Sequence, residues 1–159
     1  MTPAVRIAVC GPGNATAGEA ELAREVGALL AEAGAVLICG GLGGAMEAAA
    51  RGAASRGGLT VGVLPGNDST AANPYIVLPL PTGMGEMRNA LVVRFADAVI
   101  AVGGGWGTLS EVALAMKTGK PVVLLAPDRA RDLPVPEAAD AADAVRLALD
   151  AAARRTGHA

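Results

Sequence analysis

The stretch DAVIAVGGGWGTLSEVALAMKTG, residues 97–119, contains three kinds of local structure in succession. Its first part is apolar throughout, which is typical of a strand that is buried on both faces. Three consecutive glycines and Trp106-Gly107 follow, and we expect them to form a loop. From Thr108 the apolar residues recur at helical spacing as far as Gly119, so this part predicts a helix. A buried strand that leads through a glycine loop into a helix is the repeating unit of a parallel α/β sheet.

The same alternation extends over the chain of 159 residues. Apolar runs predict strands at 5–10, 35–40, 59–65, 75–80, 97–102 and 121–126. Helical patterns predict helices at 17–33, 45–56, 83–96, 108–119 and 137–153. We therefore predict one domain over residues 1–159, a doubly wound, Rossmann-like α/β fold with a parallel sheet of about six to seven strands and helices on both faces. Residues 155–159 are expected to fray.

Composition disfavours several classes of function. The net charge of −2 gives no electrostatic reason to bind nucleic acid. No apolar run reaches the ~18 residues that a membrane helix needs, so we expect a cytoplasmic protein with no membrane partner. Cys10 and Cys39 each end an apolar run and are expected to be reduced and buried, although a disulfide between neighbouring strands is conceivable. His158 is the only histidine, so we expect no metal site, no resident cofactor and no histidine-based catalysis.

Glycine-rich loops follow three of the predicted strands, at 11–13, 40–44 and 103–107. A dinucleotide site is disfavoured because the third glycine of its fingerprint is displaced to Gly18, and because no acidic residue ends the second strand. A P-loop is disfavoured because Lys120 precedes a proline at the start of a strand instead of opening a helix.

The loop at 103–107 is better suited to an anion. Its glycines let the backbone approach a ligand, and the amides that open the following helix have no partner within that helix. Together with the helix dipole, these amides predict a phosphate site. The phosphate-binding residues that we expect are Gly103, Gly104, Gly105, Trp106, Gly107 and Thr108.

Two residues of this segment have a second interpretation. The pattern Thr108-x-x-Glu111 is also a capping box, in which Glu111 reaches back to the amide of Thr108. Facing the first helical turn, the Glu111 carboxyl should have a low pKa and be ionised at neutral pH. Trp106, the only tryptophan, either covers the surface or forms a wall of the pocket.

The motif GGGWGTLSE, residues 103–111, resembles the PGGxGTxxE signature of the Lonely-guy family, many of whose members are misannotated as lysine decarboxylases. The segments GGLGGAMEAAARGA (40–53) and LTVGVLP (59–65) are similar to that family's earlier glycine loop, helix and following strand, so the resemblance covers nearly the whole chain. It implies a Rossmann-like, usually dimeric protein that binds nucleoside 5′-monophosphates. Authentic members cleave the base from the ribose 5′-phosphate.

The resemblance also implies roles for individual residues. Arg88 would hold the phosphate or the departing base, and Glu111 would stabilise the oxocarbenium-like transition state, which makes these two the candidate catalytic residues. Without the resemblance, Arg88 would be read as a solvated helix residue paired with Glu86 or another neighbour. The other ligand-binding residues that we expect are Gly11, Asn14, Gly41, Gly43 and Gly44.

The sequence departs from the family signature at two positions, where Gly103 replaces a proline and Asn89 replaces a lysine. With TGMGEMRN (82–89), these features are similar to a short branch that includes molybdenum-cofactor carrier proteins. Two functions therefore stay open. The first is a phosphoribohydrolase that acts on a nucleoside monophosphate, and the alternative is a non-catalytic carrier of a phosphorylated ligand such as molybdenum cofactor or AMP. The expected protein partner is a second copy of the chain, in a homodimer or a dimer of dimers.

Overall fold

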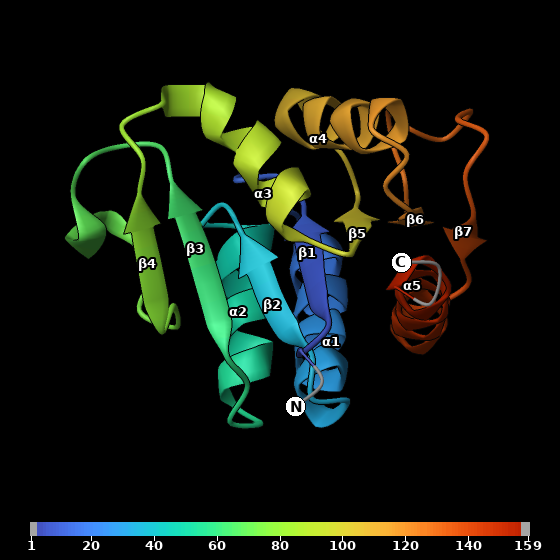
Figure 1. Cartoon of the computed structure of the whole chain (residues 1–159), viewed down its shortest axis with the longest axis horizontal. Coiled ribbons are helices and arrows are strands. Elements are labelled where there is room, and N and C mark those ends of the chain that lie inside the picture. The colour runs from blue at the N-terminus through green and yellow to red at the C-terminus, as the bar shows by residue number, and fades with distance from the viewer. Residues whose placement is uncertain (1–2, 157–159) are drawn as a thin grey trace.

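The computed structural model describes residues 3–156 and contains a seven-stranded sheet in the order β4-β3-β2-β1-β5-β6-β7 (Figure 1). Every pair of neighbouring strands in it is parallel. The strands are β1 (Arg6–Cys10), β2 (Val36–Cys39), β3 (Thr60–Leu64), β4 (Leu78–Pro81), β5 (Ala98–Val102), β6 (Val122–Leu125) and β7 (Glu137–Ala138). The α/β, Rossmann-like prediction is confirmed.

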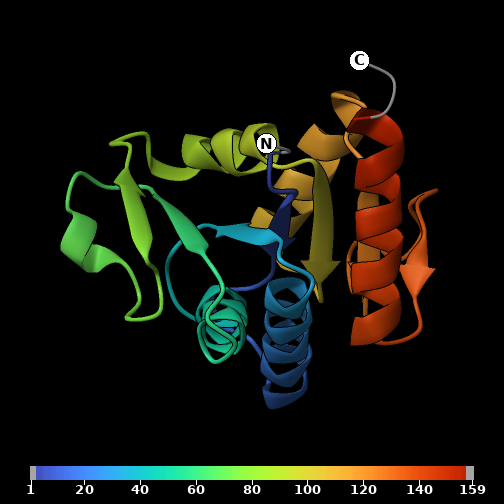
Figure 2. The same cartoon turned by 60° about the horizontal axis from the view of Figure 1, so that its bottom comes forward.

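Helices cover both faces of this sheet (Figures 1 and 2). Helices α1 (Ala17–Glu32), α2 (Ala45–Ala54) and α5 (Ala141–Thr156) pack on one face. Helices α3 (Asn89–Phe95) and α4 (Trp106–Lys117) pack on the other, and η1 (Ser69–Ala71) and η2 (Gly85–Arg88) are short 3₁₀ helices. Successive residues of β1 point to opposite faces of the sheet, and because helices cover both faces, these residues enter two separate apolar cores.

Strand β1 is the point from which the chain winds in both directions. From β1 the chain proceeds through β2 and β3 to β4, then returns and adds β5, β6 and β7 on the other side of β1. The direction of winding therefore reverses between β1 and β5. Loops that leave two such strands diverge to opposite faces of the sheet and open a crevice at the strands' carboxyl ends. The fold thus places the glycine loops after β1 and β5 at the two borders of one crevice.

Helices α1 and α2 approach each other at two glycines. A methyl group on Gly27 would lie 1.9 Å from the carbonyl oxygen of Ala49, and one on Gly52 would lie 1.9 Å from the carbonyl oxygen of Arg24. Neither position can hold a side chain unless the helices separate. The small-residue face of α2 therefore packs against α1 within the same chain.

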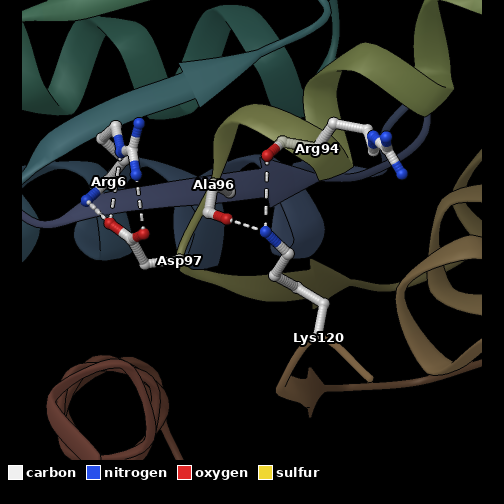
Figure 3. A network of polar contacts seen from close by, with 5 residues as sticks. All are labelled: Arg6, Arg94, Ala96, Asp97 and Lys120. Carbon is white, nitrogen blue, oxygen red and sulfur yellow. Dashed lines mark hydrogen bonds and ion pairs between the residues drawn. The ribbon is translucent and has the colours of Figure 1, made fainter. Parts of the chain in front are cut away.

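Asp97, which directly precedes β5, joins the amino ends of two strands (Figure 3). Its carboxylate accepts a hydrogen bond from the backbone nitrogen of Arg6 at 2.9 Å and pairs with the Arg6 guanidinium at 2.9 Å. Lys120, just before β6, donates to the carbonyl oxygens of Ala96 and of Arg94, the latter at 3.4 Å. These contacts fix the amino ends of β1, β5 and β6, while the glycine loops lie at the opposite ends of β1 and β5.

The last helix begins later than the sequence predicts. Strand β7 occupies the start of the segment expected to be helical, and α5 begins only at Ala141. Asp140 explains this boundary, because its carboxylate accepts a hydrogen bond from the backbone nitrogen of Asp143 at 2.8 Å and so caps the helix. A two-residue strand is too short to leave a periodic signal in the sequence.

The helix predicted over residues 83–96 is divided into η2 and α3. Gly83 and Gly85 have φ values of 65° and 60°, a left-handed conformation that a right-handed helix excludes. The chain therefore turns through η2 first and reaches regular α-helical geometry at Asn89. This change of geometry places Arg88 at the junction of the two elements.

Smaller differences concern boundaries at the edges. Strand β4 begins at Leu78, three residues later than the predicted strand 75–80, and it contains Pro79, which an edge strand tolerates because one of its sides has no partner. Helix α5 extends to Thr156, into the segment expected to fray, and residues 157–159 lie outside the described part of the chain. Within residues 3–156, no helix is long and apolar enough to cross a membrane.

The two cysteines are buried and free. Cys10 belongs to the core on the α3–α4 side of the sheet, whereas Cys39 belongs to the core on the α1–α2 side. Side chains on opposite faces of a sheet diverge, so this geometry opposes the disulfide that the sequence left conceivable.

Candidate functional site

A cavity of about 360 Å³ lies at the carboxyl ends of β1 and β5, where the winding of the sheet reverses. The sequence-predicted residues that line it are Gly11, Asn14, Arg88, Gly105, Trp106, Gly107, Thr108 and Glu111. They come from the β1–α1 loop, from η2 and from the start of α4. The fold therefore brings together segments that are nearly 100 residues apart in the sequence, as in other open α/β sheets that bind ligands.

The start of α4 supplies free backbone donors to this cavity. Gly105 is the N-cap residue, and no side chain caps the helix. The first backbone bond of the helix joins the Leu109 nitrogen to the Gly105 oxygen at 3.0 Å, so the amides before Leu109 have no helical acceptor. These amides and the positive end of the helix dipole favour an anion.

Thr108 adds a hydroxyl to the same wall. Its side chain is buried, with 3% of the residue exposed, and lines the cavity. The Thr108 oxygen Oγ1 has no hydrogen-bond partner among the described residues. A buried hydroxyl without a partner costs about 1–3 kcal/mol, so this atom is suited to a ligand that supplies the missing bond.

Gly103 has a structural role that explains its departure from the family signature. Its φ is 61°, which a proline ring fixed near −65° cannot adopt. A methyl group at this position would also lie 2.2 Å from Oε1 of Glu19. Gly103 and Gly104 lie outside the residues that line the cavity, and they shape the turn that leads from β5 to it. Their contact with phosphate stays a prediction.

The structure corrects the capping-box interpretation. Helix α4 begins at Trp106, two residues earlier than predicted, so Glu111 lies a turn further into the helix than a capping residue would. Burial raises the pKa of the Glu111 carboxyl to about 7, although a hydrogen bond with the Cys10 thiol and the charge of Arg88 both lower it. The expected low pKa is therefore wrong, because loss of water outweighs the helix dipole at this position.

Arg88 is buried and is not the solvated partner of Glu86. Its Nε donates to the carbonyl oxygen of Val63 at 2.9 Å, and its Nη1 donates to Oδ1 of Asn89. A methyl group on Gly40 would lie 2.8 Å from Arg88 Nη2, so that glycine leaves room for the guanidinium. Arg88 is therefore held by the ends of β2 and β3 while it faces the cavity.

Asn89 connects this arginine to the start of α4. Its Nδ2 donates to Oγ of Ser110 at 3.2 Å, and Ser110 Oγ donates to the carbonyl oxygen of Gly107 at 2.7 Å. An amide suits this chain of bonds because it accepts from Arg88 and donates to Ser110 at once, which a lysine cannot do. The Asn89 departure from the family signature thus has a physical reason in this structure.

The remaining glycines have mainly structural surroundings. Gly41 and Gly44 have φ values of 78° and 66°, and Gly44 packs against the backbone of Pro12 and Gly13 in the β1–α1 loop. Gly41, Gly43 and Gly44 lie outside the lining of the cavity, and their ligand-binding role stays a prediction.

Some features of the site have no sequence signal. Met46 and Glu86 line the cavity, and the guanidinium of Arg129 lies 4.3 Å from the centre of the exposed Trp106 ring. Arg129 lies between the predicted strand at 121–126 and the predicted helix at 137–153, in a segment without a motif that could identify it. Within residues 3–156, no group of three or more His, Cys, Asp or Glu side chains is placed to hold a metal ion.

The chain is similar in sequence to known proteins over most of its length. The model of the SLOG cluster4 family matches residues 4–153. An uncharacterised protein of Archaeoglobus fulgidus is 47% identical over 123 residues, which cover 77% of this chain and 81% of that protein.

Two solved structures resemble the chain over nearly its whole length. The molybdenum cofactor binding protein of the phototrophic bacterium Rippkaea orientalis has a TM-score of 0.88 and 37% identity, with 94% of this chain and 98% of that chain covered. The molybdenum cofactor carrier protein of Chlamydomonas reinhardtii has a TM-score of 0.85 and 34% identity, with 95% and 99% covered.

Proposed function

Since the chain belongs to the SLOG cluster4 family, we propose that it binds a small phosphorylated ligand in the cavity at the carboxyl ends of β1 and β5 and carries this ligand without converting it. Among phosphorylated ligands, molybdenum cofactor is the cargo that the comparisons favour. Two structures that resemble this chain over almost all of their length are named as binding or carrier proteins for that compound.

The single observation that supports phosphate binding is the unpartnered oxygen of Thr108 beside the uncapped start of α4. The helix amides favour a negative charge, and the hydroxyl needs an acceptor, which a phosphate oxygen provides. A neutral ligand would satisfy the hydroxyl but not the helix dipole. A phosphorylated ligand therefore fits this wall better than an uncharged one.

A phosphoribohydrolase is the second candidate, because Arg88 and Glu111 both line the cavity. Such an enzyme would use an ionised carboxylate to stabilise the cation that forms as the glycosidic bond breaks. Burial raises the pKa of Glu111 to about 7, so its protonated and ionised forms coexist near neutral pH in the unliganded molecule. The similar structures that are named as binding or carrier proteins favour carriage, and release of free base distinguishes the two functions.

Binding and turnover can be measured on the same samples. The wild-type protein is titrated calorimetrically with AMP, other nucleoside monophosphates and inorganic phosphate, and each mixture is then analysed by chromatography for free base. Carriage predicts phosphate-dependent binding and no free base, whereas release of base from any monophosphate would establish the hydrolase. Binding of adenosine as tightly as AMP would contradict the phosphate site.

Thr108→Val removes the hydroxyl and keeps the shape of the side chain. We expect about tenfold weaker binding of phosphate-bearing ligands, because one hydrogen bond to a charged group is lost, with little change in folding. The variant should even gain stability in the absence of ligand, since its buried oxygen has no partner. Thr118→Val is a suitable control, because the Thr118 hydroxyl already donates to the Leu114 oxygen, at the far end of α4. Equal affinity of T108V and wild type would count against the site.

A further inference from the structure

The loop between β6 and β7 lies directly against the turn that leads into the phosphate site. A methyl group on Gly104 would lie 3.7 Å from the backbone nitrogen of Arg129 and 3.9 Å from that of Asp128, which is van der Waals contact. The loop begins at Ala126, whose φ of 48° turns the chain sharply at the end of β6. The β6–β7 loop is therefore a neighbour of the glycine turn, as the β1–α1 loop is.

Trp106 holds the side chain of Arg129 in this place. The guanidinium carbon lies 4.3 Å from the centre of the indole ring, within the range of a cation–π contact. Trp106 is the first residue of α4 and lines the same cavity as Gly107 and Thr108, and the residue is 72% exposed. Arg129 forms no ion pair with any of the residues 3–156. Its N–H donors are therefore available beside the site.

The charges of the cavity require a further cation if the ligand is a phosphate ester. The charged side chains that line it are Glu86, Arg88 and Glu111, so the acidic groups outnumber the basic one. The helix dipole contributes only about half a positive charge, whereas a phosphate monoester carries about −1.5 to −2 at neutral pH. Arg88 already donates to Val63 and Asn89. The cavity wall alone leaves most of the phosphate charge unbalanced.

We propose that Arg129 is a further phosphate-binding residue, which Trp106 holds beside the start of α4 until a ligand arrives. This inference rests on the proposed phosphate site and adds the residue that supplies its missing positive charge. When a ligand binds, the Arg129 guanidinium moves from its position over the Trp106 ring. It then donates hydrogen bonds to the phosphate oxygens that face away from the helix amides. The ligand class is thus a phosphate monoester whose dianion is held between the helix start and the β6–β7 loop.

Trp106 provides the readout, because it is the only tryptophan of the chain. Tryptophan emission is followed while the wild-type protein is titrated with AMP, with inorganic phosphate and with adenosine as the uncharged control. We expect a saturable change with the two phosphate-bearing probes and a much smaller one with adenosine. The change arises because the cation above the ring moves towards the bound anion.

Arg129→Gln tests the residue itself. The loss of a charged hydrogen bond in a partly solvated place should weaken AMP and phosphate binding about five- to tenfold and remove most of the emission change. Adenosine binding should stay as in wild type. Arg131→Gln, which removes the same charge two residues further along the loop, is the matched control and should bind both probes like wild type. Trp106→Phe, measured by calorimetry, should retain most of the affinity because the aromatic face is preserved.

The outcomes separate this inference from the proposed function. If wild type and R129Q bind AMP and phosphate equally, Arg129 has no role and the inference fails while the phosphate site stands. If R131Q weakens binding as much as R129Q, the effect is general surface charge, and the inference also fails. If wild type binds neither probe, the phosphate site and this inference both fail.

Discussion

The Glu111 carboxyl is largely removed from water, because only 7% of the residue is exposed. The sequence pattern places it in a capping box, where the helix dipole would lower its pKa. In the structure α4 begins at Trp106, so Glu111 lies beyond the first turn and is buried near Cys10. The motif identified a residue of the cavity, but it could not indicate how much water the folded chain removes from it.

The raised pKa of Glu111 predicts how stability depends on pH. Between about pH 4.5 and 7 the folded protein retains a proton that the unfolded chain has released, so the free energy of unfolding falls as the pH rises through this window. The shift from 4.5 to about 7, at roughly 1.4 kcal/mol per unit, corresponds to about 3 kcal/mol at pH 8. Below pH 4.5 this cost is absent.

Glu111→Gln keeps the shape of the protonated acid and cannot ionise. The stability difference between E111Q and wild type should therefore be small at pH 4 and should grow to about 3 kcal/mol in favour of the variant at pH 8. Urea denaturation of both proteins across this range measures it, and the comparison cancels the titration of all other groups. A difference that stays constant with pH would contradict the assigned pKa.

Elements were predicted best where a long periodic pattern was decisive. The apolar strands and the long helix α1 lie close to their expected positions, and Gly34 and Gly119 follow their helices in the left-handed conformation expected of such ends. The short strand β7 and the division between η2 and α3 depend instead on the Asp140 cap and on the conformations of Gly83 and Gly85. Such single-residue effects carry no period that a sequence pattern can reveal.

At the contact between α1 and α2, we expect a glycine-to-alanine substitution to lower the stability of the protein, although helix propensity alone would raise it. Alanine is favoured over glycine by about 1 kcal/mol in a helix, so Gly52→Ala would ordinarily stabilise α2. Here its methyl group would meet the Arg24 carbonyl oxygen at 1.9 Å, and we expect a net loss of about 1–3 kcal/mol. Gly18→Ala is the control, because the nearest atom to its methyl group, Thr16 Oγ1, lies 4.0 Å away.

Chemical denaturation compares these two glycine variants directly. G18A should match wild type or exceed it by a few tenths of a kcal/mol, since it gains helix propensity without a clash. If G52A were as stable as G18A, the two helices would have room to separate, and the close approach at Gly52 would be wrong.

At the scale of the whole molecule, the topology decides which residues meet. The order of the strands has no sequence signal, but the sequence does predict glycine loops at the carboxyl ends of the strands of a doubly wound sheet. The observed order brings the loops after β1 and β5 together, and Arg88 reaches the same cavity from η2. Arg129 could not be found in this way, because its place depends on the path of the irregular β6–β7 loop.

The chain is expected to associate with a second copy of itself. A groove of about 650 Å³ runs between α3 and α4, with Met87, Ala90 and Leu114 in its lining. Met87 is 73% exposed, and the exposed Trp106 ring adjoins the same groove. Exposed apolar surface of this kind marks interaction sites, and a second copy of the chain is the partner that the family resemblance implies. We therefore propose that the α3–α4 surface forms the contact of a homodimer.

Met87→Asp tests this surface, because it places a charge in the centre of the proposed contact, which leaves the charge without water or a partner when two copies meet. Wild type should show the mass of a dimer, or of a dimer of dimers, in light scattering at micromolar concentration, and M87D should shift towards the monomer. Val77→Asp is the matched control: Val77 is 64% exposed but precedes β4, at the far edge of the sheet. That variant should retain the wild-type mass. A wild-type monomer would refute the dimer altogether, whereas a dimer that M87D leaves intact would place the contact on another face.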